Sequence, residues 1–333
     1  MAIMTETWTR FRYRLATIPE VVALVSFLSI FLFFSFSTDT FLTPIAFANI
    51  LTFGSITGIV VIGVAMLMIS GEFDLSVGAT FAVASYVFAL SLISGTAPIL
   101  AAILALLVSA VLGLINGIIV TRTGIPSFIA TLGSMLAYRG IVRAIGSGDF
   151  ATYTGEAVNF FNYLNGPITS LNNLFTPVPN FRLSIVWFIL IAFIFSFILM
   201  RTKYGNWTFA AGGSPEAALA QGVNVTRVKI TNFMITAVLA GLAGIMQFAY
   251  RSSVDPLRGE GMELIAVAAC VIGGTRLKGG VGTIFGAMVG IILLQMLEQG
   301  LVLMRIPIQI FQAVAGLIII IAVISNTYLR GGE

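Results

Sequence analysis

Long segments with few or no charged residues recur along the whole chain, and they set the strongest limit on its fold. Each holds about 20 residues, the length at which a helix rising 1.5 Å per residue crosses the ~30 Å hydrocarbon layer of a bilayer. Hydrophobic residues make up 58% of the sequence and charged residues only 9%, a composition far from that of an average soluble domain. The sequence therefore predicts an all-α polytopic membrane protein.

The apolar segments number ten, so about ten transmembrane helices are expected in one domain over residues 1–333. The eighth segment is too short to cross a bilayer upright, and nine or eleven helices are the alternatives. The first segment is interpreted as a retained span, because no small-residue cleavage site follows it. The predicted spans are residues 19–38, 48–70, 75–95, 98–120, 127–147, 183–201, 229–249, 262–274, 282–303 and 306–325.

Basic residues divide unequally between the two sides of these spans. With the N-terminus inside, eleven Lys and Arg residues fall on the cytoplasmic side and six on or near the outer side. The positive-inside rule then favours cytoplasmic N- and C-termini. Residues 1–18 and the loop 202–228 are expected to be cytoplasmic, and the loop 148–182 outside. This distribution also explains the net charge of +4, so no nucleic-acid partner is expected.

The residue types do not suggest an enzyme or a metal site. The sequence has no histidine and a single cysteine, so the commonest metal ligand and acid–base group is missing. Ionisable residues at membrane depth, chiefly Glu263 and Glu298, are too few for a proton or sodium relay, and Glu298 could simply pair with Arg305. We expect no catalytic residue, no bound metal and no cofactor held by this chain.

Two glycine-containing segments interrupt the apolar runs with almost no room for a loop. Residues 71–78 contain two acidic side chains, and residues 273–282 contain basic ones. Such breaks, including re-entrant ones, are tolerated at membrane depth only where protein or water covers them. The two could face each other; capping of the next helix by the first, and lipid-headgroup contact by the second, are the alternatives. The predicted break residues are Gly71, Asp74, Ser76, Gly78, Gly273 and Gly274.

A weak internal similarity suggests an inverted repeat. Asn116-Gly117 precedes Ile125-Pro126 as Gln299-Gly300 precedes Ile306-Pro307. With ten spans, the two copies lie five spans apart and have opposite orientations, as in many transporters built from inverted repeats.

The loop 202–228 is the one long polar stretch between spans. Ser214 suits the N-cap of a short helix, Pro215 its first position and Glu216 its first turn, with Gly222 at its end. A rigid cytoplasmic helix of this kind can transmit force, and an ordinary capped loop helix is the alternative.

Five motifs, in order along nearly the whole chain, resemble the permease subunits of bacterial ABC importers for monosaccharides, of the ribose, xylose, galactose and autoinducer-2 type. The chain departs from the family at Glu72, where glycine is usual, and at Arg276 and Lys278, where smaller polar residues are common. These departures leave the choice of substrate and partner open. The motifs are GEFDLSVG (71–78), IPSFIATLGSMLAYRG (125–140), GGSPEAALAQGVNVTRVK (212–229), AGLAGI (240–245) and GMELIAVAACVIGGTRLKGGVGTIFGAMVG (261–290).

The resemblance implies a homo- or heterodimer of permeases in the bacterial cytoplasmic membrane. It also implies two cytoplasmic ABC ATPase subunits, which bind ATP and Mg, and a periplasmic or lipid-anchored sugar-binding protein. The helix in 202–228 resembles the coupling helix that docks into the ATPase. The residues expected in this contact are Ser214, Pro215, Glu216, Ala217, Ala218 and Gly222.

Polar residues within apolar spans are expected to line the sugar path, because a neutral substrate must be held weakly enough to leave. Each could equally form a hydrogen bond between helices. Related permeases for branched-chain amino acids or nucleosides are one alternative function, and a self-sufficient secondary transporter, independent of ATP, is another. The path residues predicted by polarity alone are Asn49, Asn116, Ser127, Thr131 and Gln247.

Overall fold

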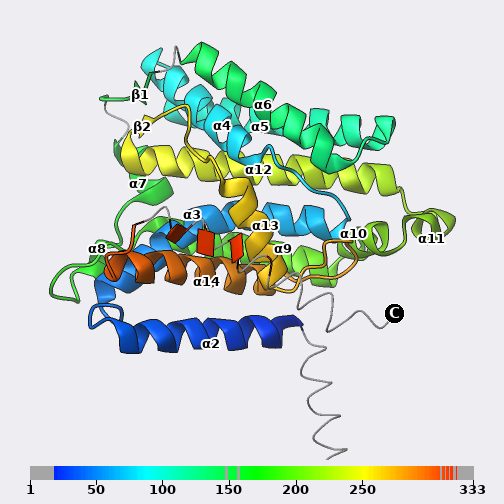
Figure 1. Cartoon of the computed structure of the whole chain (residues 1–333). Coiled ribbons are helices and arrows are strands. Elements are labelled where there is room, and N and C mark those ends of the chain that lie inside the picture. The colour runs from blue at the N-terminus through cyan, green and yellow to red at the C-terminus, as the bar shows by residue number, and fades with distance from the viewer. Residues whose placement is uncertain are drawn as a thin grey trace, which may run out of the picture.

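The computed structural model describes residues 19–146, 149–155, 158–307, 310–311, 313–314, 316–317 and 320. The described part is almost entirely helical (Figure 1). The strands β1 (Ala151–Thr152) and β2 (Ser253–Val254) pair antiparallel. The first helices are α2 (Pro19–Ser37), α3 (Pro44–Ile69), α4 (Val77–Ile93), α5 (Pro98–Thr123), α6 (Ser127–Ile145), α7 (Val158–Asn165) and α8 (Thr169–Asn172). They are followed by α9 (Leu183–Arg201), α10 (Lys203–Gly213), α11 (Pro215–Ala220), α12 (Val225–Arg251), α13 (Met262–Ile272) and α14 (Ile284–Leu303).

Nine of the ten predicted spans coincide with helices, namely α2 to α6, α9 and α12 to α14. The tenth, 306–325, lies mostly outside the described residues. Six helices are long and apolar enough to cross a membrane, judged by length and composition, and α4, α13 and the described part of α2 are shorter apolar helices. The polytopic all-α class is therefore confirmed, and the count of ten crossings stays a prediction.

Two spans begin earlier than the apolar pattern predicts, because polar side chains cap them. Helix α3 begins at Pro44, four residues before the predicted start, and Thr43 Oγ1 accepts from the Ala46 N–H at 3.3 Å. Helix α12 begins at Val225, and Asn224 Oδ1 accepts from the Arg227 N–H at 2.9 Å. A cap satisfies an N–H that has no partner inside the helix, so each helix continues beyond its apolar residues.

Two non-helical segments lead into the shorter helices α4 and α13 (Figure 1). Residues 70–76, the α3–α4 segment, connect the end of α3 to the start of α4. Residues 252–261, the α12–α13 segment, do the same between α12 and α13. The two helix starts meet, because a Cβ on Gly78 would overlap the carbonyl oxygen of Gly259. Gly78 itself is helical, so the predicted break at 71–78 is too long and ends at Ser76.

Helix α3 lies at the centre of the molecule. Its most apolar stretch is 83% buried, and it packs on α9, α12, α13 and α14. In contrast, only 22%, 17% and 28% of the corresponding stretches of α5, α6 and α9 are buried. Apolar helix faces left open in this way suit contact with lipid or with another membrane subunit.

The helix contacts follow an approximate two-fold pattern. Helix α3 packs on α14 as α12 packs on α5, and α13 packs on α14 as α4 packs on α5. The α3–α4 segment and the α12–α13 segment occupy corresponding places in this pattern. Such an arrangement is expected of the inverted repeat, which remains a prediction.

Candidate functional site

The helix predicted in the polar loop is present as α11. Pro215 and Glu216 stand in its first turn, and Gly222, with a φ of 81°, follows its end. Ser214 directly precedes the helix, but its side chain accepts no cap hydrogen bond. Its ψ of 88° lies below the β region from which cap side chains usually reach the first turn. The predicted cap is therefore right in position and wrong in its hydrogen bond.

One face of α11 is buried and the other is open. Ala218 is buried in a small apolar cluster with residues of α10 and α12. Glu216, Ala217 and Leu219 are exposed, and Leu219 is 58% exposed. Figure 1 shows α11 at one end of the bundle, opposite the end that holds α7, α8 and the two strands. An exposed leucine and a carboxylate on a short helix at the end of the bundle suit contact with another protein.

Helix α10, directly before α11, contacts the two predicted breaks through glycines. A Cβ on Gly212 would overlap the carbonyl oxygen of Ile69 and lie 2.8 Å from the backbone nitrogen of Gly280. The Gly280 N–H donates to the same Ile69 carbonyl at 2.8 Å. A Cβ on Gly279 would lie 2.7 Å from Gly71 Cα. Three backbones therefore meet with no side chains between them, and the prediction that the two breaks face each other is confirmed.

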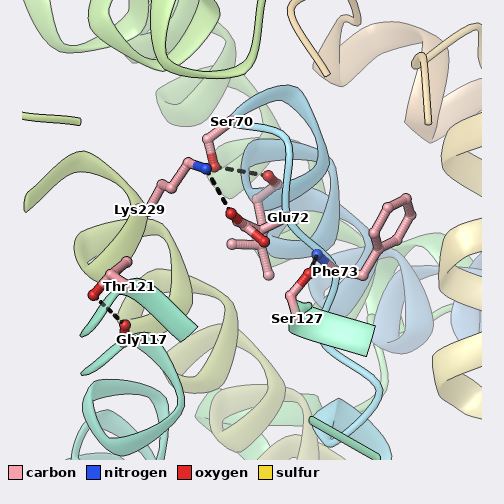
Figure 2. A network of polar contacts seen from close by, with 8 residues as sticks. Ser70, Glu72, Phe73, Gly117, Thr121, Ser127 and Lys229 are labelled. Carbon is pink, nitrogen blue, oxygen red and sulfur yellow. Dashed lines mark hydrogen bonds and ion pairs between the residues drawn. The ribbon is translucent and has the colours of Figure 1, made fainter. Parts of the chain in front are cut away.

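An ion pair joins the α3–α4 segment to α12. Lys229 Nζ lies 2.6 Å from Glu72 Oε1, and the two side chains are only 17% and 12% exposed. Figure 2 shows this pair beside Ser70 and Phe73. Glu72 is one of the positions at which the sequence departs from the family motif, and here it binds a residue of α12 that follows the polar loop.

Two of the predicted path residues hold the α3–α4 segment in place. Ser127 Oγ accepts from the Phe73 N–H at 3.1 Å (Figure 2), and Thr131 Oγ1 accepts from the Leu75 N–H at 3.0 Å. Both hydroxyls lie on one face of α6, four residues apart. They supply acceptors for N–H groups that belong to no helix, which would be costly to bury unpaired.

A chain of buried polar side chains fixes the start of α4. Asp74 Oδ1 accepts from the Ser76 N–H at 2.7 Å and from the Ser76 hydroxyl at 2.6 Å. Asn116 Nδ2 donates to Ser76 Oγ at 2.8 Å, and the Tyr138 hydroxyl donates to Asn116 Oδ1 at 3.1 Å. Asp74 thus binds the N–H directly before α4, whereas the predicted cap from the Ser76 side chain is absent.

Arg139, further along α6, holds the α12–α13 segment. Its Nη1 donates to the carbonyl oxygens of Pro256 at 3.0 Å and Arg258 at 2.7 Å. One helix therefore binds both non-helical segments. Sequence reasoning did not predict this role, although an arginine in an apolar span generally requires an internal partner.

A cavity of about 180 Å³ lies among α3, α4, α12, α13 and α14. Gln247 lines it, and Asn116, Ser127 and Thr131 are not among its described lining residues. Asn49, half-buried on α3, is not among them either. The structure therefore places one predicted path residue at the cavity and three at the chain break and its supports. That any of the five lines a sugar path stays a prediction.

Two further polar residues line the cavity that sequence reasoning missed. Thr57 and Gln295 each interrupt an apolar helix, which is the same signal that selected Gln247. Gln295 Nε2 donates to Glu298 Oε2 at 2.8 Å. Glu298 therefore pairs with its own helix neighbour, and no ion pair with Arg305 is found in the part of the chain that the structure describes.

The described ranges contain no group of three or more His, Cys, Asp or Glu side chains placed to hold a metal ion. Cys270 is free and fully buried, with its thiol donating to the Val61 carbonyl at 3.7 Å. The break residues Gly273 and Gly274 follow directly after α13, at the start of the α13–α14 loop. The expectations about catalysis, metals and cofactors stay predictions.

Known proteins similar to this chain are transport permeases. The ribose import permease protein RbsC of Bacillus subtilis is 35% identical over 291 residues, which are 87% of this chain and 87% of that protein. The L-arabinose ABC transporter permease protein AraH of Azospirillum brasilense is 32% identical, over 91% of this chain and 86% of its own length. The D-allose transport system permease protein AlsC of Escherichia coli is 32% identical, over 88% and 86%. No solved structure matches the chain.

A family model matches residues 46–323, most of the chain. This range includes α11, the glycine contacts of α10, the α3–α4 segment and the α12–α13 segment. The chain therefore belongs to the family described as the permease component of the branched-chain amino acid transport system.

Proposed function

We propose that this chain is the membrane-spanning subunit of an ATP-driven ABC importer and forms the translocation path for a sugar. The named relatives are permeases for ribose, L-arabinose and D-allose, which favours a sugar over the branched-chain amino acids after which the family is named. Nucleosides, and transport without ATP, are disfavoured by the same relatives. The subunit itself is not an enzyme.

The observation that carries this proposal is the placement of α11 directly after α10, which contacts the two chain breaks. Its outer face is exposed, and α10 behind it contacts the α3–α4 segment and the α13–α14 loop backbone to backbone. Because nothing compressible lies between these backbones, a push on α11 would move both breaks. ATP hydrolysis in a partner would reach the path in this way, through Ser214, Pro215, Glu216, Ala217, Ala218 and Gly222.

We infer the remaining partners from the two ends of the bundle and from its open apolar faces. The end with α11 would be cytoplasmic, together with both termini, and would bind two ATPase subunits that hold ATP and Mg. The opposite end, with α7 and α8, would receive a periplasmic or lipid-anchored sugar-binding protein. The open apolar faces of α5, α6 and α9 would contact lipid or a second permease, identical or paralogous. The site of action would be the bacterial cytoplasmic membrane.

The test is a charge reversal on α11 in the assembled transporter. The chain is purified with its candidate ATPase and reconstituted in vesicles with the binding protein, and ATPase association and ATP-dependent uptake of D-ribose, L-arabinose and D-allose are measured. Glu216→Arg is expected to weaken association and uptake while the thermal unfolding midpoint is kept. Asp39→Arg is the matched control for ATPase association, because Asp39 is also exposed and lies between α2 and α3, away from α11.

Two results would contradict the proposal. Uptake by the native protein without ATP would mean that the chain drives transport itself. Equal ATPase association of native protein and Glu216→Arg would remove α11 from the contact.

A further inference from the structure

The cavity lies at the place where the two shorter helices begin. Phe81, in the second turn of α4, and Met262, the first residue of α13, both line it. The neighbouring contact between Gly78 and Gly259 joins the two helix starts. The cavity thus lies where the α3–α4 segment and the α12–α13 segment lead into their helices.

Polar groups with unused hydrogen-bonding capacity point to a ligand for this cavity. Gln295 Nε2 donates to Glu298 Oε2, which leaves Glu298 Oε1 and the Gln295 carbonyl oxygen without a partner among the described residues. The Gln247 amide makes no hydrogen bond within the same residues. Two amides and a carboxylate can accept several hydroxyl protons and donate to hydroxyl oxygens.

The charges of the lining favour a neutral ligand. Arg258, the cation at the cavity, pairs through Nη2 with Asp255 Oδ2 at 2.7 Å, and its buried Nε has no hydrogen-bond partner among the described residues. Because Asp255 balances the charge of Arg258, the Glu298 carboxylate is the uncompensated charge of the described lining and disfavours the carboxylate of an amino acid. The Arg258 Nε–H can donate to a hydroxyl oxygen instead. The rings of Phe53 and Phe81 add flat apolar walls, which suit the C–H face of a sugar ring.

We propose that the cavity is a transient binding site for one neutral monosaccharide, with Gln247, Gln295 and Glu298 binding its hydroxyls. This inference rests on the proposed import function and names where the substrate stops within the chain. At about 30 Å³ per water molecule, the cavity corresponds to roughly six waters, so it holds one small solute at a time. Few polar groups and apolar walls give the weak binding that onward transport requires.

The test compares substitutions at the cavity with one beside it, in the complete transporter with its ATPase and binding protein. Glu298→Gln and Gln247→Leu are measured against Gln299→Leu, which changes a residue next to Glu298 that is not among the lining residues. Initial rates of ATP-dependent uptake are measured for D-ribose, L-arabinose and D-allose. The Glu298→Gln transporter is expected to take up sugar about tenfold more slowly, because a sugar hydroxyl loses its hydrogen bond to a charged group.

The ratio of the three uptake rates separates binding from structure. Because the hydroxyls of the three sugars point differently, both cavity variants are expected to change that ratio, while Gln299→Leu keeps it. If both variants keep native rates, or lower all three rates by one factor, the cavity is not a sugar site even though the import function stands. Uptake of L-leucine and of no sugar by the native transporter would overturn the import proposal itself.

Discussion

The α3–α4 segment and the α12–α13 segment do the same task with opposite chemistry. Each is a non-helical segment between a long helix and a shorter one, and each is bound by α6. The first presents N–H groups, which donate to the hydroxyl oxygens of Ser127 and Thr131. The second presents carbonyl oxygens, to which Arg139 donates.

The difference shows that α6 offers acceptors to the segment that presents N–H groups and a donor to the segment that presents carbonyl oxygens. At 1.5 Å per residue, Thr131 and Arg139 are about 12 Å apart along the helix, so one rigid rod fixes the two segments relative to each other. Unpaired backbone groups in a membrane interior are costly, whether they are N–H donors or carbonyl acceptors. A helix that satisfies both segments therefore couples the two halves of the fold.

The largest effect is expected where the two segments meet directly. Gly78→Ala would place a methyl group against the Gly259 carbonyl and 2.5 Å from Glu263 Oε2. Because backbone cannot give way as a side chain can, we expect a loss of about 3 kcal/mol or more in unfolding free energy. The measurement is the unfolding midpoint of the purified protein in detergent.

Gly133→Ala is the control for this substitution. Gly133 lies within α6, and a Cβ there would meet nothing within 4 Å. Alanine is favoured over glycine in a helix interior by roughly 1 kcal/mol, so this variant should be unchanged or slightly stabilised. Equal midpoints for Gly78→Ala and Gly133→Ala would show that the two helix starts do not meet.

The next effect is expected from releasing the α12–α13 segment alone. Arg139→Leu suits the apolar surroundings of α6 but leaves the carbonyls of Pro256 and Arg258 without their donor. We expect the unfolding free energy to fall by about 2 kcal/mol. Arg143→Leu is the control, because Arg143 lies one turn further along α6 and is exposed. Hydrogen exchange should rise in residues 252–261 and stay low in residues 70–76; a rise in both would mean that the segments open together.

Releasing the α3–α4 segment should have a slightly smaller effect. The double substitution Ser127→Ala and Thr131→Val removes both acceptors while nearly preserving volume, and it leaves the N–H groups of Phe73 and Leu75 unpaired. We expect a loss of about 1 to 2 kcal/mol, measured by the same unfolding midpoint. Ser134→Ala is the control, because Ser134 donates only within α6, to the Ala130 carbonyl. Equal stability of the double variant and the control would sink the assigned role of the two hydroxyls.

Most of the fold followed from the apolar segments, because membrane spans are long and their composition is extreme. Helix starts such as Pro44 and Val225 were misplaced, since a cap depends on one polar side chain outside the apolar run. The α12–α13 segment was not singled out by its residue pattern. Arg139 holds this segment, and Arg139 is 117 residues away from Pro256 in sequence.

The candidate site was predictable only where its pattern is local in sequence. Local patterns of proline, acidic residue and glycine predicted α11 correctly, because the rules for helix ends act over a few residues. Polarity selected Asn116, Ser127 and Thr131, but polarity alone cannot separate a path residue from one that satisfies backbone. Only the contacts of each side chain, with Phe73 or Leu75 or with a cavity, make that distinction.

The smallest effect is expected from the ion pair of each segment: Glu72–Lys229 joins the α3–α4 segment to α12, whereas Asp255–Arg258 lies within the α12–α13 segment. Glu72 and Lys229 are 12% and 17% exposed, whereas Asp255 and Arg258 are 21% and 33% exposed and lie three residues apart. Less solvent means less screening, so a double-mutant cycle with Glu72→Gln and Lys229→Met should give a coupling of about 1 kcal/mol, and the cycle with Asp255→Asn and Arg258→Met about 0.3 kcal/mol. High salt should reduce the second coupling more. The reverse order would mean that the Glu72 pair is open to water, and that the chain's departure from the family motif at Glu72 does not fasten the α3–α4 segment to α12.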